Sequence, residues 1–241
     1  MKRKICCFAF LCMALILGGC AQIPAYDDAY DPLEKVNRYS YKFNDTIDRA
    51  VLKPVAKGYK KTIPSVVRTS VRNFFSNLGE PLTIVNQLLQ WKPADAMSDL
   101  MRFTFNSTFG LAGLFDIATG WDLPKHQEDF GQTMGVWGVG QGAYLMLPLL
   151  GPSNVRDFAG LPFDWLLNPT LYRSTPVRYS ANAMKTVSVR ADLLETTRVL
   201  DETSIDRYIS IREAYRQLRW NRLHDGNPPE PDFFDELFDE P

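Results

Sequence analysis

The stretch GQTMGVWGVGQGAYLMLPLLG, residues 131–151, has no charged side chain at any of its 21 positions. It is long enough to span a membrane, but its six glycines and Pro148 argue against a regular helix standing alone in lipid. Two interpretations follow. The stretch is either the glycine-rich core of a soluble domain or part of a protein that lies in a bilayer without crossing it in simple spans.

The segment just before it, residues 104–121, is similarly poor in charge, with Asp116 as its only charged residue. Within it, Ser107, Gly110 and Gly113 follow one another at intervals of three. Small residues at this spacing allow helices to approach closely. We therefore expect tight contacts between helices in this part of the chain.

Helical periodicity dominates the rest of the sequence. A first helix is predicted from Asp31, with Asp31 and Glu34 forming a capping box around Pro32, up to a kink or end at Pro54. Further predicted helices cover residues 65–78, with Gly79 as the stop, and residues 82–90, 94–109, 191–200 and 204–223. No region shows sustained period-two alternation, so we predict a mainly α fold, with residues 31–223 forming a single helical domain.

The N-terminus has the pattern of an export signal. Three basic residues precede an apolar run, residues 5–17, which is too short to be an ordinary spanning helix. Residues 17–20, Leu-Gly-Gly-Cys, resemble a bacterial lipobox. We predict a signal peptide over residues 1–19, acylation of Cys20 and a tether over residues 20–30, and Ala21 after the cysteine favours the outer membrane. The alternative is a plain signal peptide with an incidental cysteine.

Composition excludes several functional classes. The 27 basic and 28 acidic residues nearly cancel, so we expect no nucleic-acid partner. All four cysteines lie in the first 20 positions and there are only two histidines, which leaves no candidate metal or cofactor site. A GxSxG elbow fails at Val155, no HExxH is present, and His126 beside Glu128 and Asp129 lacks a nucleophile. We therefore do not expect an enzyme.

The C-terminal part separates into a basic helix and an acidic tail. Arginines outnumber acids in residues 204–223, which suits a partner carrying negative charge, such as a lipid phosphate. Residues 224–241 carry seven acids and four prolines, and we expect this tail to be disordered by itself. Its function is either to dock a soluble carrier protein or only to keep the chain soluble.

Several segments resemble one family, the MlaA or VacJ lipoproteins. The similarity runs in order over about residues 31–170 and includes the lipobox. It is carried by DPLEKVNRYSYKFNDTIDRAVLKPVAKGY (31–59), NFFSNLGEP (73–81), RFTFNSTFGLAGLFDIAT (102–119) and DFGQTMGVWGVGQGAYLMLPLLGPSNVRD (129–157).

The resemblance implies a lipoprotein of the Gram-negative outer membrane. Its fold would be a bent helical ring in the inner part of the bilayer with a central amphipathic channel. Such proteins remove mislocalised phospholipids from the outer leaflet and pass them to a soluble periplasmic lipid carrier, and they associate with trimeric porins. An alternative is a scaffold lipoprotein that binds porins and moves no lipid.

Two groups of residues are candidates for the lipid path. Trp137, Tyr144, Leu145 and Leu147 would lie on or beside it, with Gly140 and Gly142 allowing a curved backbone. On the first helix, Phe43 precedes Asn44, a poor helix former that would face a polar lumen or a neighbouring backbone. The alternatives are that the first group only packs the wall of the ring and that Asn44 makes a structural hydrogen bond.

Overall fold

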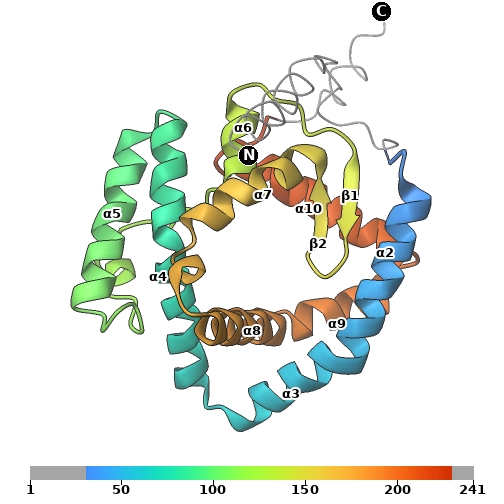
Figure 1. Cartoon of the computed structure of the whole chain (residues 1–241), viewed down its shortest axis with the longest axis horizontal. Coiled ribbons are helices and arrows are strands. Elements are labelled where there is room, and N and C mark those ends of the chain that lie inside the picture. Colours follow the sequence, from blue (N-terminus) through green and yellow to red (C-terminus); the bar gives the residue numbers. More distant parts are fainter. Residues whose placement is uncertain (1–30, 230–241) are drawn as a thin grey trace, which may run out of the picture.

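The computed structural model describes residues 31–229 of the 241. The predicted signal peptide, Cys20 with the tether, and most of the acidic tail lie outside the described residues. The helices are arranged as a ring, with α8 and α9 on one side of a central opening and α7, α10 and a β-hairpin on the other (Figure 1). The predicted mainly helical ring is confirmed.

The first arc of the ring bends at Pro54. Helix α2 (Glu34–Ile47) passes through a π-helical turn, η1 (Asp48–Leu52), into α3 (Lys53–Thr62). Pro54 lies in the first turn of α3, and the wider turn before it accommodates the missing proline N–H, as π-bulges often do. The chain therefore changes direction near Pro54 without a loop, in agreement with the predicted kink.

The predicted capping box at Asp31 is wrong. Helix α2 begins at Glu34, and no side chain caps it. The Asp31 carboxylate instead accepts hydrogen bonds from Asn37 Nδ2, at 2.8 Å, and from the Tyr208 hydroxyl of the last helix. Asp31 thus joins the two ends of the helical domain.

Helix α4 (Ser65–Leu89) continues through Gly79 and Pro81, so the predicted stop at Gly79 is also wrong. One face of α4 buries polar side chains on both sides of this point, including Asn77, Glu80 and Gln87. Contacts along that face with the antiparallel helix α5 (Pro93–Thr108) override the local helix-breaking signal.

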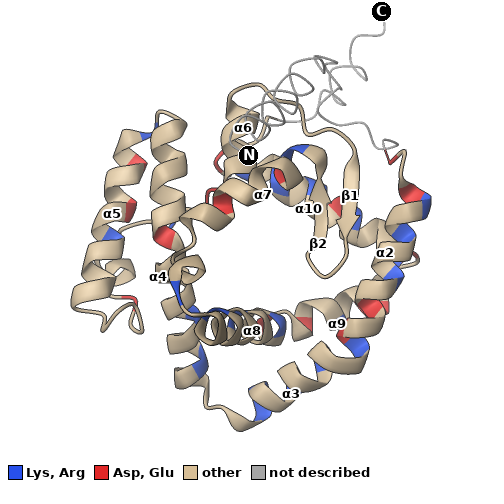
Figure 2. Ribbon diagram, in the orientation of Figure 1, with Lys and Arg blue, Asp and Glu red and all other residues tan. Residues whose placement is uncertain are grey.

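The uncharged stretch folds into a short helix and a hairpin. It forms most of α6 (Phe130–Val136) and, after a loop, strand β1 (Tyr144–Leu147) pairs antiparallel with β2 (Gly151–Asn154). The hairpin shows no charged residue (Figure 2). Sequence periodicity missed these two strands because each has four residues, too few for a clear alternation.

The remaining elements close the ring. These are η2 (Ala118–Trp121), α7 (Val155–Leu167), η3 (Pro169–Tyr172), α8 (Thr175–Asp192), α9 (Leu194–Thr203) and α10 (Arg207–Leu223). The sequence predicts α9 and α10 about three residues early and does not identify α6, α7 or α8 as helices. Helix α8 packs against both α3 and α4, and it thereby connects the arc formed by α2 and α3 to the α4–α5 pair.

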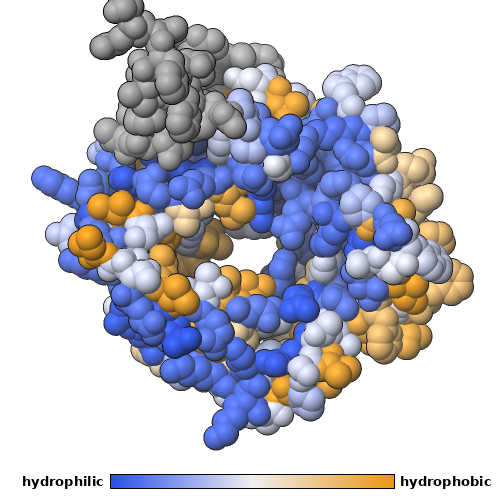
Figure 3. Space-filling view, turned by 180° about the vertical axis from the view of Figure 1, so that it is seen from behind, coloured by the Kyte–Doolittle hydropathy of each residue, from blue (hydrophilic) through white to orange (hydrophobic). Residues whose placement is uncertain are grey.

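Polar side chains form much of the interior of the ring wall. Among residues 31–229, seven of the eight largest fully buried side chains are polar or charged: Arg102, Gln87, Gln132, Glu80, Asn86, Thr133 and Asp99. Large apolar side chains lie outside, among them Trp91 (89% exposed), Phe109 (66%) and Trp121 (51%) around the α4–α5 pair. The apolar surface along that edge is seen in Figure 3. This polarity is the reverse of that in an ordinary soluble domain.

No helix among residues 31–229 combines the length and hydropathy needed to cross a bilayer.

Glycines allow the closest contacts in the wall. A Cβ at Gly160 of α7 would lie 2.9 Å from the backbone nitrogen of Gly131 in α6, and one at Gly113 would lie 2.5 Å from Asn77 Cβ. Ser107 Oγ accepts a hydrogen bond from Asn77 Nδ2 at 2.9 Å. The predicted close approach to another helix is found at Ser107 and at Gly113, which lies in the turn after α5. It is not found at Gly110, where a Cβ would meet the Asn106 and Phe115 carbonyls of its own turn.

We predict that Gly160→Ala destabilises the protein by about 1–3 kcal/mol, because the added methyl group meets backbone atoms that cannot move away alone. Gly79→Ala is the matched control, since a Cβ there meets nothing within 4 Å inside α4, and it should be neutral or stabilise by up to about 1 kcal/mol. Thermal unfolding in a neutral detergent measures both. Equal melting temperatures for the two variants would contradict the backbone contact.

Candidate functional site

The ring encloses a water-accessible opening that persists when all side chains are drawn (Figure 3). On the α4 side the opening includes a cavity of about 750 Å³. Its walls come from α4, from the segment between η2 and α6, from α8 and from the end of α10. The charged and ionisable residues lining it are Arg72, Asp116, Lys125, His126, Glu128, Asp129, Lys185 and Arg222.

The acidic residues of the cavity are neutralised by neighbours in the wall. Asp116 accepts two hydrogen bonds from Arg102 Nη2, each at 3.0 Å. Glu128 Oε1 lies 3.5 Å from Lys92 Nζ, and its Oε2 accepts a hydrogen bond from Gln90 Nε2 at 2.9 Å. These carboxylates hold the wall together and leave little negative charge to face the cavity.

Asp129 is tied into a buried cluster where α6, α7 and α10 meet. Arg219 Nη2 contacts Asp129 Oδ1 at 3.0 Å and Asp157 Oδ1 at 2.8 Å. Burial by itself would raise the pKa of Asp129, but the bonds and the charge of Arg219 hold it below its ordinary value. The carboxylate therefore stays ionised and holds the start of α6 against α10.

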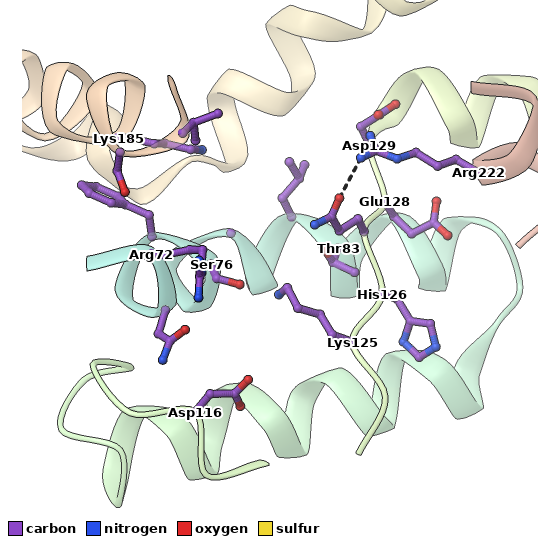
Figure 4. A pocket seen from close by; sticks show the side chains of 17 residues that line it. Arg72, Ser76, Thr83, Asp116, Lys125, His126, Glu128, Asp129, Lys185 and Arg222 are labelled. Atoms are coloured by element: carbon purple, nitrogen blue, oxygen red, sulfur yellow. Dashed lines mark hydrogen bonds between the residues drawn. The ribbon is translucent and has the colours of Figure 1, made fainter. Parts of the chain in front are cut away.

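The cationic residues differ in how far they are compensated. Lys125 Nζ donates to the buried Glu80 carboxylate, and Arg222 donates to Gln127 Oε1 at 2.8 Å, a bond drawn in Figure 4. Arg72 has only a long ion pair, 3.6 Å, with Asp192.

Lys185 has no hydrogen-bond or ion-pair partner among the described residues. It extends from α8 on the same side of the cavity as Arg72 (Figure 4). An anionic group entering the opening would meet these two cations first.

His126, Glu128 and Asp129, which the sequence analysis considered as a group, all line the cavity. Its Nδ1 lies 3.0 Å from Asp99 Oδ2, and Asp99 also accepts from Gln87 Nε2 at 2.8 Å. The imidazole thus belongs to the hydrogen-bonded interface between α4, α5 and the segment after η2.

None of the residues predicted for the lipid path lines the large cavity. Tyr144 is buried and packs with Met146 and Tyr208, while Leu145 and Leu147 alternate with it on the more exposed face of β1. Trp137 is half exposed, and its Nε1 donates to the Leu89 carbonyl at the end of α4.

The two glycines differ in their surroundings. A Cβ at Gly140 would meet no atom within 4 Å, and this residue lines a smaller pocket of about 160 Å³ between the loop and α10. Gly142 has a φ of +66°, and a Cβ there would approach the Val155 side chain to 3.0 Å. Gly142 therefore provides the predicted backbone curvature just before β1.

Asn44 makes the structural hydrogen bonds that the sequence left as its alternative. Its Nδ2 donates to the Leu147 carbonyl at 2.9 Å, and its Oδ1 accepts from the Leu149 N–H at 2.7 Å. The neighbouring Phe43 is half exposed. One asparagine of α2 thus fixes both sides of the hairpin turn.

The cations of the cavity were missed in the sequence because they come from distant elements. Only one signal was available for Lys185. It is the single charged residue between Arg178 and Arg190, in a segment with no clear helical periodicity.

Comparison with known proteins identifies the relatives of this chain. Residues 29–222 match the family model described as MlaA lipoprotein. An Escherichia coli protein named intermembrane phospholipid transport system lipoprotein MlaA is 34% identical over 222 residues, covering 90% of this chain and 87% of that protein. The protein of the same name from Haemophilus influenzae is 33% identical and covers 94% and 93%.

Two further matches extend this set. An uncharacterised Rickettsia bellii protein is 36% identical over 204 residues, covering 84% of this chain and 80% of its own. A solved structure, from work on the structural basis for maintenance of bacterial outer membrane lipid asymmetry, superposes with a TM-score of 0.72 at 34% identity. It covers 82% of this chain and 99% of the solved one.

We predict that Asn44→Ala releases the hairpin turn from α2, because both of its side-chain bonds are lost. Amide hydrogen exchange at Leu149 should accelerate roughly five- to thirtyfold, as expected for a loss of about 1–2 kcal/mol in local stability. Lys42→Ala, an exposed change on the same helix, is the control. Unchanged exchange at Leu149 in the Asn44 variant would show that the turn holds without this clamp.

Asp164 gives a pH-dependent prediction. Burial, with the nearby charge of Asp129, raises the pKa of this carboxyl to about 7, and the Phe130 N–H donates to it at 2.9 Å. A folded-state pKa above the unfolded value means that stability is lost as pH rises from about 4 to about 7. Asp164→Asn should therefore match the wild type near pH 4 and exceed it increasingly above, by roughly 1.4 kcal/mol per pH unit up to pH 7. Parallel stability curves, measured by thermal unfolding across pH, would contradict the shift.

Proposed function

The chain belongs to the MlaA lipoprotein family, and on that premise we propose that it removes mislocalised phospholipids from the outer leaflet of the outer membrane. It passes them through the opening of the ring to a soluble periplasmic carrier. Its relatives are named as lipoproteins of an intermembrane phospholipid transport system, and the superposed structure concerns outer membrane lipid asymmetry. A role in maintaining lipid asymmetry follows from both.

The observation that carries the proposal is the reversed polarity of the ring. Apolar side chains such as Trp91 and Phe109 cover its outer edge, while the cavity along α4 is lined by charged and polar groups such as Lys185 and Arg72. An apolar exterior suits contact with acyl chains, whereas a polar opening suits a headgroup. A phospholipid has both chemistries in one molecule.

Such a path lowers the two large costs of moving a phospholipid. Exposing two acyl chains of about 15 methylenes each to water costs roughly 25 kcal/mol, which corresponds to something on the order of days per event. A headgroup crossing hydrocarbon meets a similar obstacle. The ring provides polar groups for the headgroup while the tails stay beside apolar surface, so no bond is made or broken.

Anchoring places the ring where the lipid is. Acyl chains on Cys20, outside the described residues, would hold the protein on the periplasmic side of the outer membrane, because each buried methylene contributes about 0.8 kcal/mol. The ring would then be embedded in the inner part of that bilayer. The exposed apolar side chains of the α4–α5 pair are the surface that lipid, or a trimeric porin, would cover.

Within the opening, the headgroup phosphate would meet Lys185 and Arg72, the least compensated cations. The β1–β2 hairpin, with Leu145 and Leu147 on its more exposed face, would border the path on the opposite side, and Trp137 and Phe43 would lie on the outer wall. The acidic C-terminal tail would dock the soluble carrier. Direction would come from the affinity of that carrier for lipid.

We predict that Lys185→Glu lowers transfer of a fluorescent phospholipid from proteoliposomes to the purified carrier by about tenfold, because the added charge repels the phosphate. Lys185→Arg should keep most of the transfer. Lys42→Glu, at an exposed position of α2 outside the cavity, is the charge-matched control and should transfer normally.

Equal transfer by Lys185→Glu and Lys42→Glu would contradict the proposal that phospholipid passes through the opening. Transfer at background rate by the unmodified protein, with and without the Cys20 anchor, would favour the scaffold that binds porins and moves no lipid.

A further inference from the structure

A second cleft lies on the outer rim of the ring, between α3 and α9. It has a volume of about 410 Å³ and is distinct from the central cavity. Its lining is almost entirely cationic, with one acidic and one apolar residue: Lys53, Lys57, Lys60, Lys61, Leu194, Glu195 and Arg198. Figure 2 shows the basic residues along α3, a helix that contains no acidic residue.

The lysines of α3 repel one another. Lys57 has Lys53 and Lys61 at four residues and Lys60 at three, so three like charges lie next to it on the helix surface. Such pairs destabilise a helix unless something compensates them. The charge on the helix is therefore concentrated around Lys57.

Helix α9 compensates only the two lysines on either side. Lys53 Nζ lies 3.4 Å from Asp201 Oδ2, and Lys60 Nζ lies 3.2 Å from Glu195 Oε1. Glu195 is shared with Arg198, at 3.3 Å, so it does not fully neutralise Lys60. Lys57 and Lys61 have no hydrogen-bond or ion-pair partner in the described chain. Two uncompensated cations thus remain in a cleft already rich in positive charge.

The arc that carries the cleft also exposes valine side chains, although none of these valines lines the cleft itself. Val51 and Val55 are about half exposed where η1 passes into α3, and Val66 (71% exposed) and Val67 lie just past the corner between α3 and α4. Lysines at the boundary of an apolar surface are typical of segments at the headgroup level of a membrane. A free anion would use the lysines alone, whereas a phospholipid bound there would also keep its acyl chains in the surrounding bilayer.

We propose that the α3–α9 cleft is a binding site for the phosphate of an anionic phospholipid, with Lys57 and Lys61 as its ligands. A headgroup carrying an amine would be disfavoured, because its positive charge would enter a cleft with five cations and one carboxylate lining it. The site selects a phosphodiester without a compensating amine, such as phosphatidylglycerol.

This site rests on the proposed function only in that the ring is in contact with lipid. It holds a lipid at the rim of the ring and does not lie on the transfer path. Variants of the cleft and variants of the central cavity therefore separate the two proposals.

The test is native mass spectrometry of the full-length protein in a neutral detergent, with equal amounts of dioleoyl phosphatidylglycerol and dioleoyl phosphatidylcholine. We expect the wild type to retain phosphatidylglycerol about tenfold more than phosphatidylcholine, and Lys57→Gln/Lys61→Gln to lose that preference. The control is Lys35→Gln/Lys42→Gln, which removes the same charge from exposed lysines of α2 and should keep the preference. Transfer of phospholipid to the carrier should be the same in Lys57→Gln/Lys61→Gln as in the wild type.

Several results would overturn the site. These are equal retention of the two lipids by the wild type, equal loss in both double variants, and a preference unchanged in Lys57→Gln/Lys61→Gln. Inorganic phosphate or glycerophosphoglycerol displacing the lipid at the concentration of the lipid itself would show a site for free anions. Unchanged melting temperatures establish that the double variants are folded.

Discussion

The pairing of buried charges is the constraint on which the ring depends. An ionised group inside a protein is stable only when a partner and hydrogen bonds replace the water it loses. Arg102 is 1% exposed and meets this condition with Asp116, Thr119 and the Leu123 carbonyl. Arg219 does so with two aspartates from different helices. Because each cluster joins three or more segments, the wall is held by polar contacts and its apolar residues remain free to face outward.

This distribution links stability to function. A soluble domain buries its large apolar side chains and exposes its charges, which would leave no polar path through its middle. Here the buried apolar residues form only small clusters, such as Ala56 with Ala191 and Leu194. The charged groups that line the opening are continuous with those that hold the wall. Replacing Arg102 or Arg219 would therefore weaken the ring and alter its lumen together. Lys185 makes no hydrogen bond or ion pair with the described wall, so its replacement is the better probe of the proposed transport.

Much of the fold could be predicted from the sequence, but the residues that line the opening could not. Apolar spacing identified α2, α5 and α10, and the uncharged residues 131–151 correctly pointed away from a simple span. Gly79 predicted a stop that α4 does not have, because a face of buried polar residues packs against α5 on both sides of it. Helix α8 lacked clear periodicity since it packs on α3, α4 and α9 with different faces. Lys185 could not be placed, as its position depends on how distant elements close the ring.

We propose that a phospholipid headgroup passes through the polar opening. Proteoliposomes containing a phospholipid with a photoreactive headgroup test it most directly, with the labelled positions mapped by mass spectrometry after a brief flash. We expect adducts on the α4 and α8 segments that carry Arg72 and Lys185. Fewer adducts should form after the purified carrier has removed the photoreactive lipid from the proteoliposomes. Adducts confined to the outer edge of the ring, with none on these two segments, would contradict it.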